Sequence, residues 1–250
     1  MKIKTSLLIF GSLVSPSFAA LFASGHGDIG IAYEDEGDGP EFFLHVHLHG
    51  EEEEEEGHEE EGEEHEHEGM EYEPSDITIV APSSTRANMP SNAILNLGTG
   101  VPEGSPIWIL PQGNVEGVPF LGIATEELDG GLFPGGSTFE LMGINSPSGT
   151  GSFSVWQQSG IGAPEFFFSS DSPGLTTDDN KLILSTGAHD HYNYGFSEPG
   201  MWEVELSVSA MLNGTTPLVD TETFSFQVIP EPSTALLGLI GALGLLRRRR

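Results

Sequence analysis

The stretch that decides the fold is residues 41–49, EFFLHVHLH, which alternates apolar and histidine side chains. Successive side chains of a β-strand point to opposite faces of its sheet. The aliphatic side chains at positions 44, 46 and 48 are therefore predicted to face a core. On the other face lie His45, His47 and His49, together with Phe43.

Two histidines on one strand face have the spacing of a metal half-site. Same-face neighbours lie about 6.5–7 Å apart along a strand. Two imidazoles at that distance can converge on one cation, with zinc–nitrogen distances of about 2.0–2.1 Å. We therefore expect His45 and His47 to be ligands. The alternative is a solvated strand face that happens to be rich in histidine.

The segment that follows, residues 51–71, carries fourteen glutamates and almost no apolar side chains. Such a composition cannot bury enough apolar surface to offset chain entropy. We expect residues 50–73 to form a disordered loop inserted between two strands. Its histidines, His58, His65 and His67, suit either a plain solvated linker or a weak collector of cations.

The rest of the body has the pattern of an all-β protein, with 33 Gly and 17 Pro separating short apolar runs. The fold class expected for residues 20–229 is an antiparallel β-sandwich, either jelly-roll or immunoglobulin-like. A helical turn is indicated only at 126–128. Trp108, Trp156 and Trp202 are expected in the core. The strands are predicted at 28–34, 76–81, 93–97, 107–110, 120–124, 138–144, 152–157, 165–169, 181–185, 201–211 (with a twist or bulge) and 223–229.

A second histidine-rich stretch, residues 187–200, reads GAHDHYNYGFSEPG. His189 and His191 repeat the His-x-His spacing about 140 residues after the first pair, as expected if two strands face one cavity. The alternative is an aromatic-rich hairpin turn. Three aromatic side chains are candidates for the walls of that cavity: Tyr192, Tyr194 and Phe196. Asn193 is a candidate for orienting a ligand or binding backbone.

A weaker signal is His26-Gly27-Asp28, because histidine and aspartate beside glycine more often form a turn than a ligand pair. The chain has no cysteine, so disulfides, thiolate metal sites and thiol catalysis are excluded. Imidazoles and carboxylates remain, and these favour harder or borderline metals.

The charge distribution excludes nucleic acid as a partner. The formal net charge is −31. Of the eight lysines and arginines, only Arg86 and Lys181 lie outside the two ends of the chain. A body with so few basic side chains cannot neutralise the phosphates of a nucleic acid. Its field would instead attract cations.

Both ends have the pattern of sorting segments. Residues 1–19 combine two lysines, a short apolar core and small residues before a cleavage site expected after Ala19. The alternative, a membrane anchor, needs a longer apolar run. At the other end, Pro230-Glu231-Pro232 precedes a short apolar segment and four arginines. Residues 230–250 resemble the PEP-CTERM sorting signal. The resemblance implies processing by an exosortase in a Gram-negative bacterium, contact with the membrane only through this segment, and release to the periplasm, cell surface or matrix.

The body also carries a resemblance. SGHGDIGIAYE (24–34) with LHVHLH (44–49) resembles the choice-of-anchor M domain, and residues 188–210 resemble the actinobacterial surface-anchored protein repeat. Such proteins are associated with metal-uptake transporters, and a PEP-CTERM group is described as repressed by the zinc-uptake regulator. The resemblance implies a role in zinc acquisition, with a zinc transporter as a partner. The candidate ligands carried over are His26, Asp28, His45, His47, His189 and His191.

Zinc usually takes four ligands, so the six candidates are more than one site can use. The four histidines of the two His-x-His pairs are the ligands that we expect first. The sequence shows no HExxH, nucleophile elbow or phosphate-binding glycine loop, so we expect no enzyme. The leading hypothesis is extracytoplasmic zinc capture. Two alternatives stay open: a calcium-binding matrix or adhesion protein, and a metal-dependent hydrolase or carbohydrate-binding module.

Overall fold

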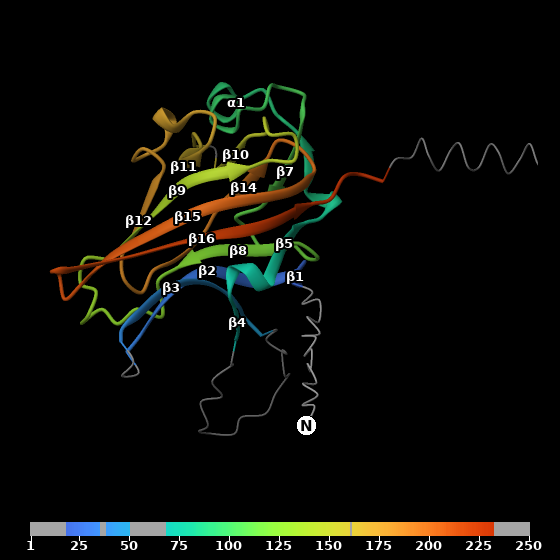
Figure 1. The fold of residues 1–250 in the computed structure, drawn as a ribbon. Helices are drawn as coiled ribbons and strands as arrows, with labels where there is room; N and C mark the ends of the chain where they lie inside the picture. Colours follow the sequence, from blue (N-terminus) through green and yellow to red (C-terminus); the bar gives the residue numbers. More distant parts are fainter. Residues whose placement is uncertain (1–18, 36–38, 51–68, 161, 233–250) are drawn as a thin grey trace, which may run out of the picture.

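The computed structural model describes residues 19–35, 39–50, 69–160 and 162–232, and it is an all-β protein (Figure 1). Most of the two predicted sorting segments (residues 1–18 of 1–19 and 233–250 of 230–250) and most of the acidic insertion, including His58, His65 and His67, lie outside these ranges. Among the described residues, no helix has the length and apolar character needed to cross a membrane.

The structure has sixteen described strands, one α-helix and three 3-10 turns. The helix is α1 (Ala93–Thr99), and the 3-10 turns are Pro74–Asp76, Ser83–Thr85 and Pro173–Leu175. The strands are β1 (Ala20–Phe22), β2 (Gly25–Glu34), β3 (Glu41–Leu48), β4 (Met70–Tyr72), β5 (Ile77–Ala81), β6 (Arg86–Asn88), β7 (Pro106–Leu110), β8 (Pro119–Ala124), β9 (Ser137–Asn145), β10 (Phe153–Gln157), β11 (Glu165–Ser169), β12 (Lys181–Leu184), β13 (His189–His191), β14 (Asn193–Phe196), β15 (Gly200–Leu212) and β16 (Thr216–Val228).

The strands form three sheets with the orders β1-β5-β16-β15-β9-β12, β11-β10-β14-β7-β6 and β13-β8-β2-β3-β4. The expected all-β, sandwich-like class is confirmed; most neighbouring strands are antiparallel, whereas β1 with β5, β5 with β16, and β2 with β8 are parallel. Parallel neighbours need a long connection between them. The pairs β2–β8 and β5–β16 are far apart along the chain, so their connections are long enough.

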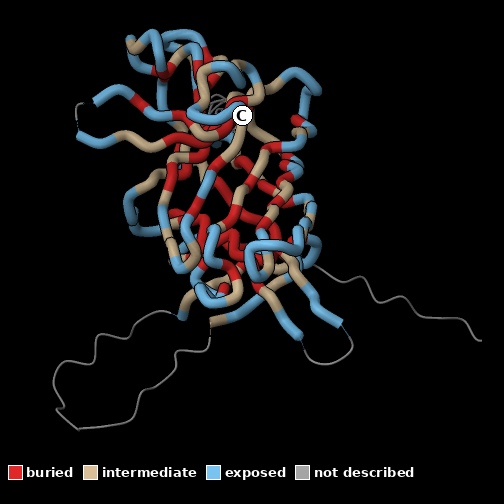
Figure 2. The backbone as a smooth tube through the Cα atoms, turned by 90° about the vertical axis from the view of Figure 1, so that its left-hand side faces the viewer, coloured by how far each residue is buried: buried red, intermediate tan, exposed pale blue. Residues whose placement is uncertain are grey.

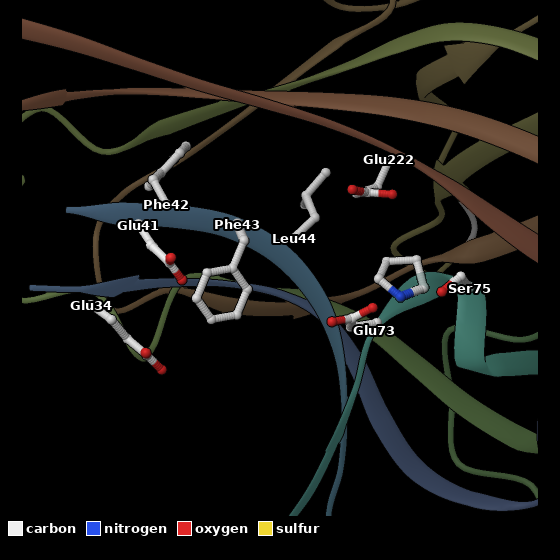
Figure 3. A pocket seen from close by; sticks show the side chains of 9 residues that line it. Glu34, Glu41, Phe42, Phe43, Leu44, Glu73, Ser75 and Glu222 are labelled. Atoms are coloured by element: carbon white, nitrogen blue, oxygen red, sulfur yellow. The ribbon is translucent and has the colours of Figure 1, made fainter. Parts of the chain in front are cut away.

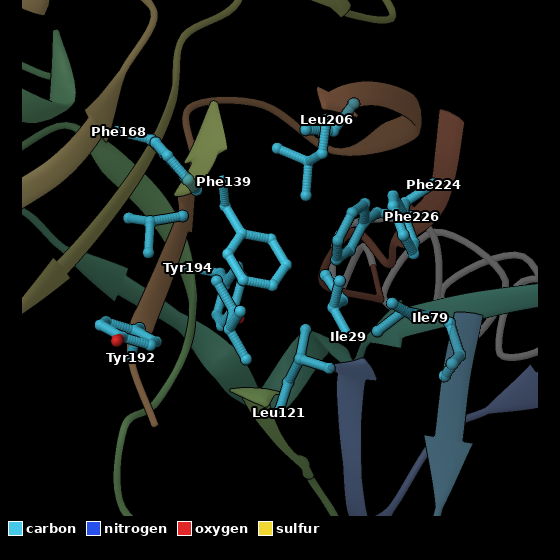
Figure 4. Close-up of a cluster of buried hydrophobic side chains, with 14 of the residues drawn as sticks. Ile29, Ile79, Leu121, Phe139, Phe168, Tyr192, Tyr194, Leu206, Phe224 and Phe226 are labelled. Carbon is cyan, nitrogen blue, oxygen red and sulfur yellow. The ribbon is translucent and has the colours of Figure 1, made fainter. Parts of the chain in front are cut away.

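The core is aromatic and draws on all three sheets (Figure 4). Ile29 of β2, Tyr194 of β14 and Phe224 of β16 are each at most 1% exposed. The long β15–β16 hairpin forms the centre of the six-stranded sheet (Figure 1). Exposed residues concentrate in the loops around this buried interior (Figure 2). The three tryptophans lie in buried positions, as expected from the sequence.

The strand predicted at 201–211 is present as β15, but the bulge expected in it lies in the neighbouring strand, where Met142 of β9 is the extra residue. The pairing of β15 with β9 shifts register between Glu205 and Leu206. On either side of the shift, β15 alternates buried and less buried side chains along nearly its whole length. The period-2 pattern of residues 201–211 was therefore sufficient to predict the strand, whereas the irregularity belongs to β9 and was not predicted.

The strand predicted at 93–97 is wrong, because these residues belong to helix α1. The side chain of Asn92 accepts hydrogen bonds from the backbone N–H groups of Ile94 and Leu95. Gly100 ends the helix in the left-handed conformation, with φ of 67°. A cap at one end and a glycine at the other define a short helix that an apolar run alone does not distinguish from a strand.

The insertion is shorter than the predicted range of 50–73. Met70–Tyr72 form β4, which pairs antiparallel with β3, with Met70 opposite Leu48 and Glu71 opposite His47. Tyr72 packs against the main core. The free edge of β3 supplies backbone partners that sequence composition does not reveal.

Candidate metal centre

The candidate site lies on one face of the five-stranded sheet β13-β8-β2-β3-β4. The register places His47 of β3 opposite Asp28 of β2, Asp28 opposite Gly122 of β8, and Gly122 opposite His191 of β13. Because directly paired residues point to the same face, these side chains form one row across four strands. Pairing within this sheet, and not proximity in sequence, brings the two distant histidine pairs to one surface.

The first group of ligands consists of His26, Asp28, His189 and His191, whose ligand atoms all lie within 4.8 Å of one another. Nε2 of His189 is 3.2 Å from Nε2 of His26 and 3.0 Å from Oδ1 of Asp28. Asp28 is buried, at 1% exposure. Such an arrangement of nitrogen and oxygen donors suits a metal ion.

Two atoms of this group are buried and make no hydrogen bond of acceptable geometry within the described residues: Nδ1 of His191, and Oδ1 of Asp28 despite its distance of 3.0 Å from Nε2 of His189. Buried polar atoms are normally paired, because an unpaired one costs about 1–3 kcal/mol. A bound cation would satisfy the carboxylate oxygen. The donor set and these unpaired atoms therefore fit a metal ion.

The second group consists of His45, His47 and Glu127. Oε1 of Glu127 is 2.9 Å from Nε2 of His45 and 3.1 Å from Nδ1 of His47. Glu127 lies in the hydrogen-bonded turn that follows β8, in which the N–H of Leu128 donates to the carbonyl of Thr125. This turn coincides with the helical turn indicated at 126–128.

The structure thus brings His26 and Asp28 together with His189 and His191, and it places His45 and His47 in a neighbouring group. The four histidines expected first do not form one cluster. The reason is the strand order: β8 and β2 lie between β13 and β3. Glu127 was not a candidate from the sequence, because nothing distinguishes it from the many other acidic residues of the chain.

His49 lies between the two groups. Its ring stacks on His47 with centroids 4.6 Å apart and on His26 with centroids 4.1 Å apart. Nε2 of His49 also lies 2.7 Å from Oδ2 of Asp28. The strand pattern placed His49 on the histidine face, but only the structure shows its contact with the buried carboxylate.

Comparison of the chain with protein-family models, with curated proteins and with solved structures found no match. The interpretation of the site therefore depends on its own geometry and chemistry.

Glycines leave room for the ligands at two points of the sheet. A Cβ at Gly122 would overlap Oδ1 of Asp28 and would lie 3.2 Å from Nε2 of His189. A Cβ at Gly30 would lie 2.8 Å from Nε2 of His45. Real Cβ atoms essentially never lie within 3.0 Å of another atom, as these would at Asp28 and His45. A side chain at either position would displace a candidate ligand.

Burial favours the neutral form of two imidazoles of the first group. It lowers the pKa of His26 to about 4, although Asp28 opposes the shift. Burial also lowers the pKa of His191, again against Asp28. Burial alone would raise the pKa of Glu127, but hydrogen bonds from His45 and His47 outweigh it and lower that pKa. Neutral imidazoles and ionised carboxylates are the protonation states that bind metals.

The aromatic side chains near the second His-x-His pair do not line the site. Tyr192 and Tyr194 lie in the core (Figure 4), as does Phe196, and each of the three is at most 1% exposed. In β13, side chains alternate between faces, so the residue after His191 points inward. Asn193 binds backbone: its Oδ1 accepts from the N–H of Gln112, and its Nδ2 donates to the carbonyl of Trp156.

Two cavities border β3. The larger, of about 570 Å³, has glutamates and Phe43 in its lining but no histidine (Figure 3). The smaller, of about 150 Å³, is lined in part by Asp28, His47 and Glu127. The smaller cavity therefore connects the two groups of candidate ligands and gives them open space.

Proposed function

We propose that this chain is an extracytoplasmic protein that binds zinc at His26, Asp28, His189 and His191 and captures it for uptake or storage. The observation that carries the proposal is the convergence of three imidazoles and one buried carboxylate, with ligand atoms within 4.8 Å. The four residues come from β2 and β13, which are separated by β8 in the sheet. Such convergence on one point favours binding of a single ion.

The donor set favours zinc over calcium or magnesium. Zinc prefers four ligands and accepts histidine nitrogen and carboxylate oxygen. Calcium takes six to eight oxygen ligands, and magnesium retains several waters around carboxylates. Imidazole ligands suit zinc and other late transition metals.

The proposed role is capture without catalysis, outside the cytoplasm. The support is the resemblance of the two ends to sorting segments and of the body to surface proteins associated with metal uptake. On this proposal an exosortase-type enzyme processes the C-terminal segment, and a zinc transporter receives the ion. Residues 20–229 contain only two basic side chains, and this scarcity favours electrostatic attraction of zinc to the surface.

The test is a zinc titration of the purified full chain in which His58, His65 and His67 are replaced by asparagine, so that the insertion contributes less binding. Asp28→Asn and His189→Asn should each weaken zinc binding at least tenfold, because each removes a ligand. Asp190→Asn is the matched control: it makes the same charge change at an exposed residue of β13.

Zinc affinity no tighter than millimolar, or equal affinity in Asp28→Asn and the control, would refute the proposal. A parallel titration with calcium separates the main alternative. If calcium raises the melting temperature and zinc does not, the calcium-binding structural role is the correct one.

A further inference from the structure

The second group, His45, His47 and Glu127, has the geometry of an ion site in its own right. Both imidazoles approach the same oxygen, Oε1 of Glu127, at 2.9 and 3.1 Å. The side chain of His45 is 3% exposed, whereas those of His47 and Glu127 are 25% and 31% exposed. One ligand is thus anchored in the protein interior and two are accessible from solvent.

A simple hydrogen-bonded pair explains less of this arrangement than a cation does. Nε2 of His45 and Nδ1 of His47 are the nitrogens that face the carboxylate, and a neutral imidazole can coordinate a metal ion through either nitrogen. A single ion would take one donor atom from each of the three side chains. Two imidazoles also converge on one carboxylate oxygen, whereas a single hydrogen-bonded pair needs only one imidazole there.

The cavity of about 150 Å³ beside His47 and Glu127 supplies the space that such an ion would need. A zinc site with three protein ligands completes its coordination with water or a bound molecule. This volume exceeds that of several water molecules. Gly30 preserves the position of His45, since a Cβ there would lie 2.8 Å from Nε2 of the imidazole.

We infer that His45, His47 and Glu127 form a second divalent-cation site, with an open coordination position, beside the four-ligand site. The two sites are distinct, because no ligand of one lies in the other group. His49 separates them, stacked between His47 and His26. The chain then binds two ions on one sheet face, about one or two strand spacings (roughly 5–10 Å) apart.

Two consequences follow for binding. The four-ligand site fills first, because it offers one more protein ligand and a buried carboxylate. The second ion binds at least tenfold more weakly, because it has one ligand fewer and is repelled by the first ion at this short distance. This second site goes beyond the proposed function and does not depend on it.

Native mass spectrometry with zinc alone tests the inference, using the full chain with asparagine at positions 58, 65 and 67. The expected result is two bound ions. Glu127→Gln should leave one, while the exposed control Glu103→Gln should leave two. His47→Asn is a second test at a partly exposed position, in case the first variant fails to fold. Circular dichroism checks the fold of each variant.

A background chain that binds no ion, or a folded Glu127→Gln chain that binds as many ions as the background chain, would overturn the inference. His189→Asn distinguishes this result from a failure of the proposed function. If His189→Asn removes an ion and Glu127→Gln does not, the second site is refuted alone. If Glu127→Gln removes an ion and His189→Asn does not, the second site stands and the first is refuted.

Discussion

Replacing Gly122 by alanine tests the metal centre through its backbone support, without removing any ligand. The added Cβ would overlap Oδ1 of Asp28, and would also lie 3.1 Å from the carbonyl of Asp190 and 3.2 Å from Nε2 of His189. Carbon and oxygen need more than 3 Å between them, so the carboxylate must move by about 1 Å. Asp28 is almost fully buried, and the space into which its carboxylate can move is the cavity of about 150 Å³ that it helps to line.

The expected loss of zinc affinity follows from that displacement. Metal sites require ligand distances within about 0.2 Å of their ideal values. A shift of about 1 Å therefore removes the carboxylate as an effective ligand. Perturbing the support of a ligand typically lowers affinity about 10–100-fold, and we expect Gly122→Ala to reach the upper end of that range. Overpacking should also destabilise the metal-free fold by about 1–3 kcal/mol.

The assay is a competition titration against a zinc-chelating dye, with urea unfolding of the metal-free chain alongside it. Gly113→Ala is the matched control, because a Cβ there meets no atom within 4 Å. In an Asp28→Ala background, Gly122→Ala should cost little further affinity, since the overlapping oxygen is gone. Wild-type zinc affinity in a folded Gly122→Ala chain would refute the assignment of Asp28 as a ligand.

Two further predictions concern stability. The melting temperature of the metal-free chain, measured in a chelator, should fall as the pH drops from 7 to 4. The unfolded chain binds a proton at His26 near pH 6.5, whereas the folded chain binds it only near the lowered pKa of about 4. The lowered pKa of Glu127 destabilises the folded chain in the same direction at the acidic end of this range. A melting temperature that is constant over this range would contradict it. Asn92→Ala should lower the free energy of unfolding by about 1 kcal/mol, because it removes the cap of α1, which accepts two backbone hydrogen bonds. Urea unfolding measures this loss, with the exposed Asn88→Ala as control, and equal stability of the two variants would show that the cap contributes nothing.

Local pattern was sufficient for the longer strands and for the histidine face of β3, but it did not predict the short strands β1, β4, β6, β13 and β14. The alternation in residues 41–49 fixes which side chains share a side of the sheet, because that period is a property of the extended backbone itself. The same reasoning identified His189 and His191 as a second pair. It failed at α1, where a short apolar run is compatible with either a helix or a strand and the capping residues decide.

Only the tertiary structure decided which ligands meet. The sequence supplied His45, His47, His189 and His191 as two similar pairs, with no information on the strands between them. Because β2 and β8 lie between β3 and β13 in the sheet, each His-x-His pair meets different neighbouring side chains. Strand order depends on long-range pairing, which leaves little trace in any one segment.

The sequence by itself thus determined the all-β class, the cation-poor body and the imidazole and carboxylate chemistry available to a site. The structure decided that Asp28 is buried against His49 and His189, that Glu127 joins His45 and His47, and that Gly122 leaves room for the carboxylate. The physical reason is that residue type and backbone period are local properties, whereas convergence of side chains on one point is set by the register of four paired strands.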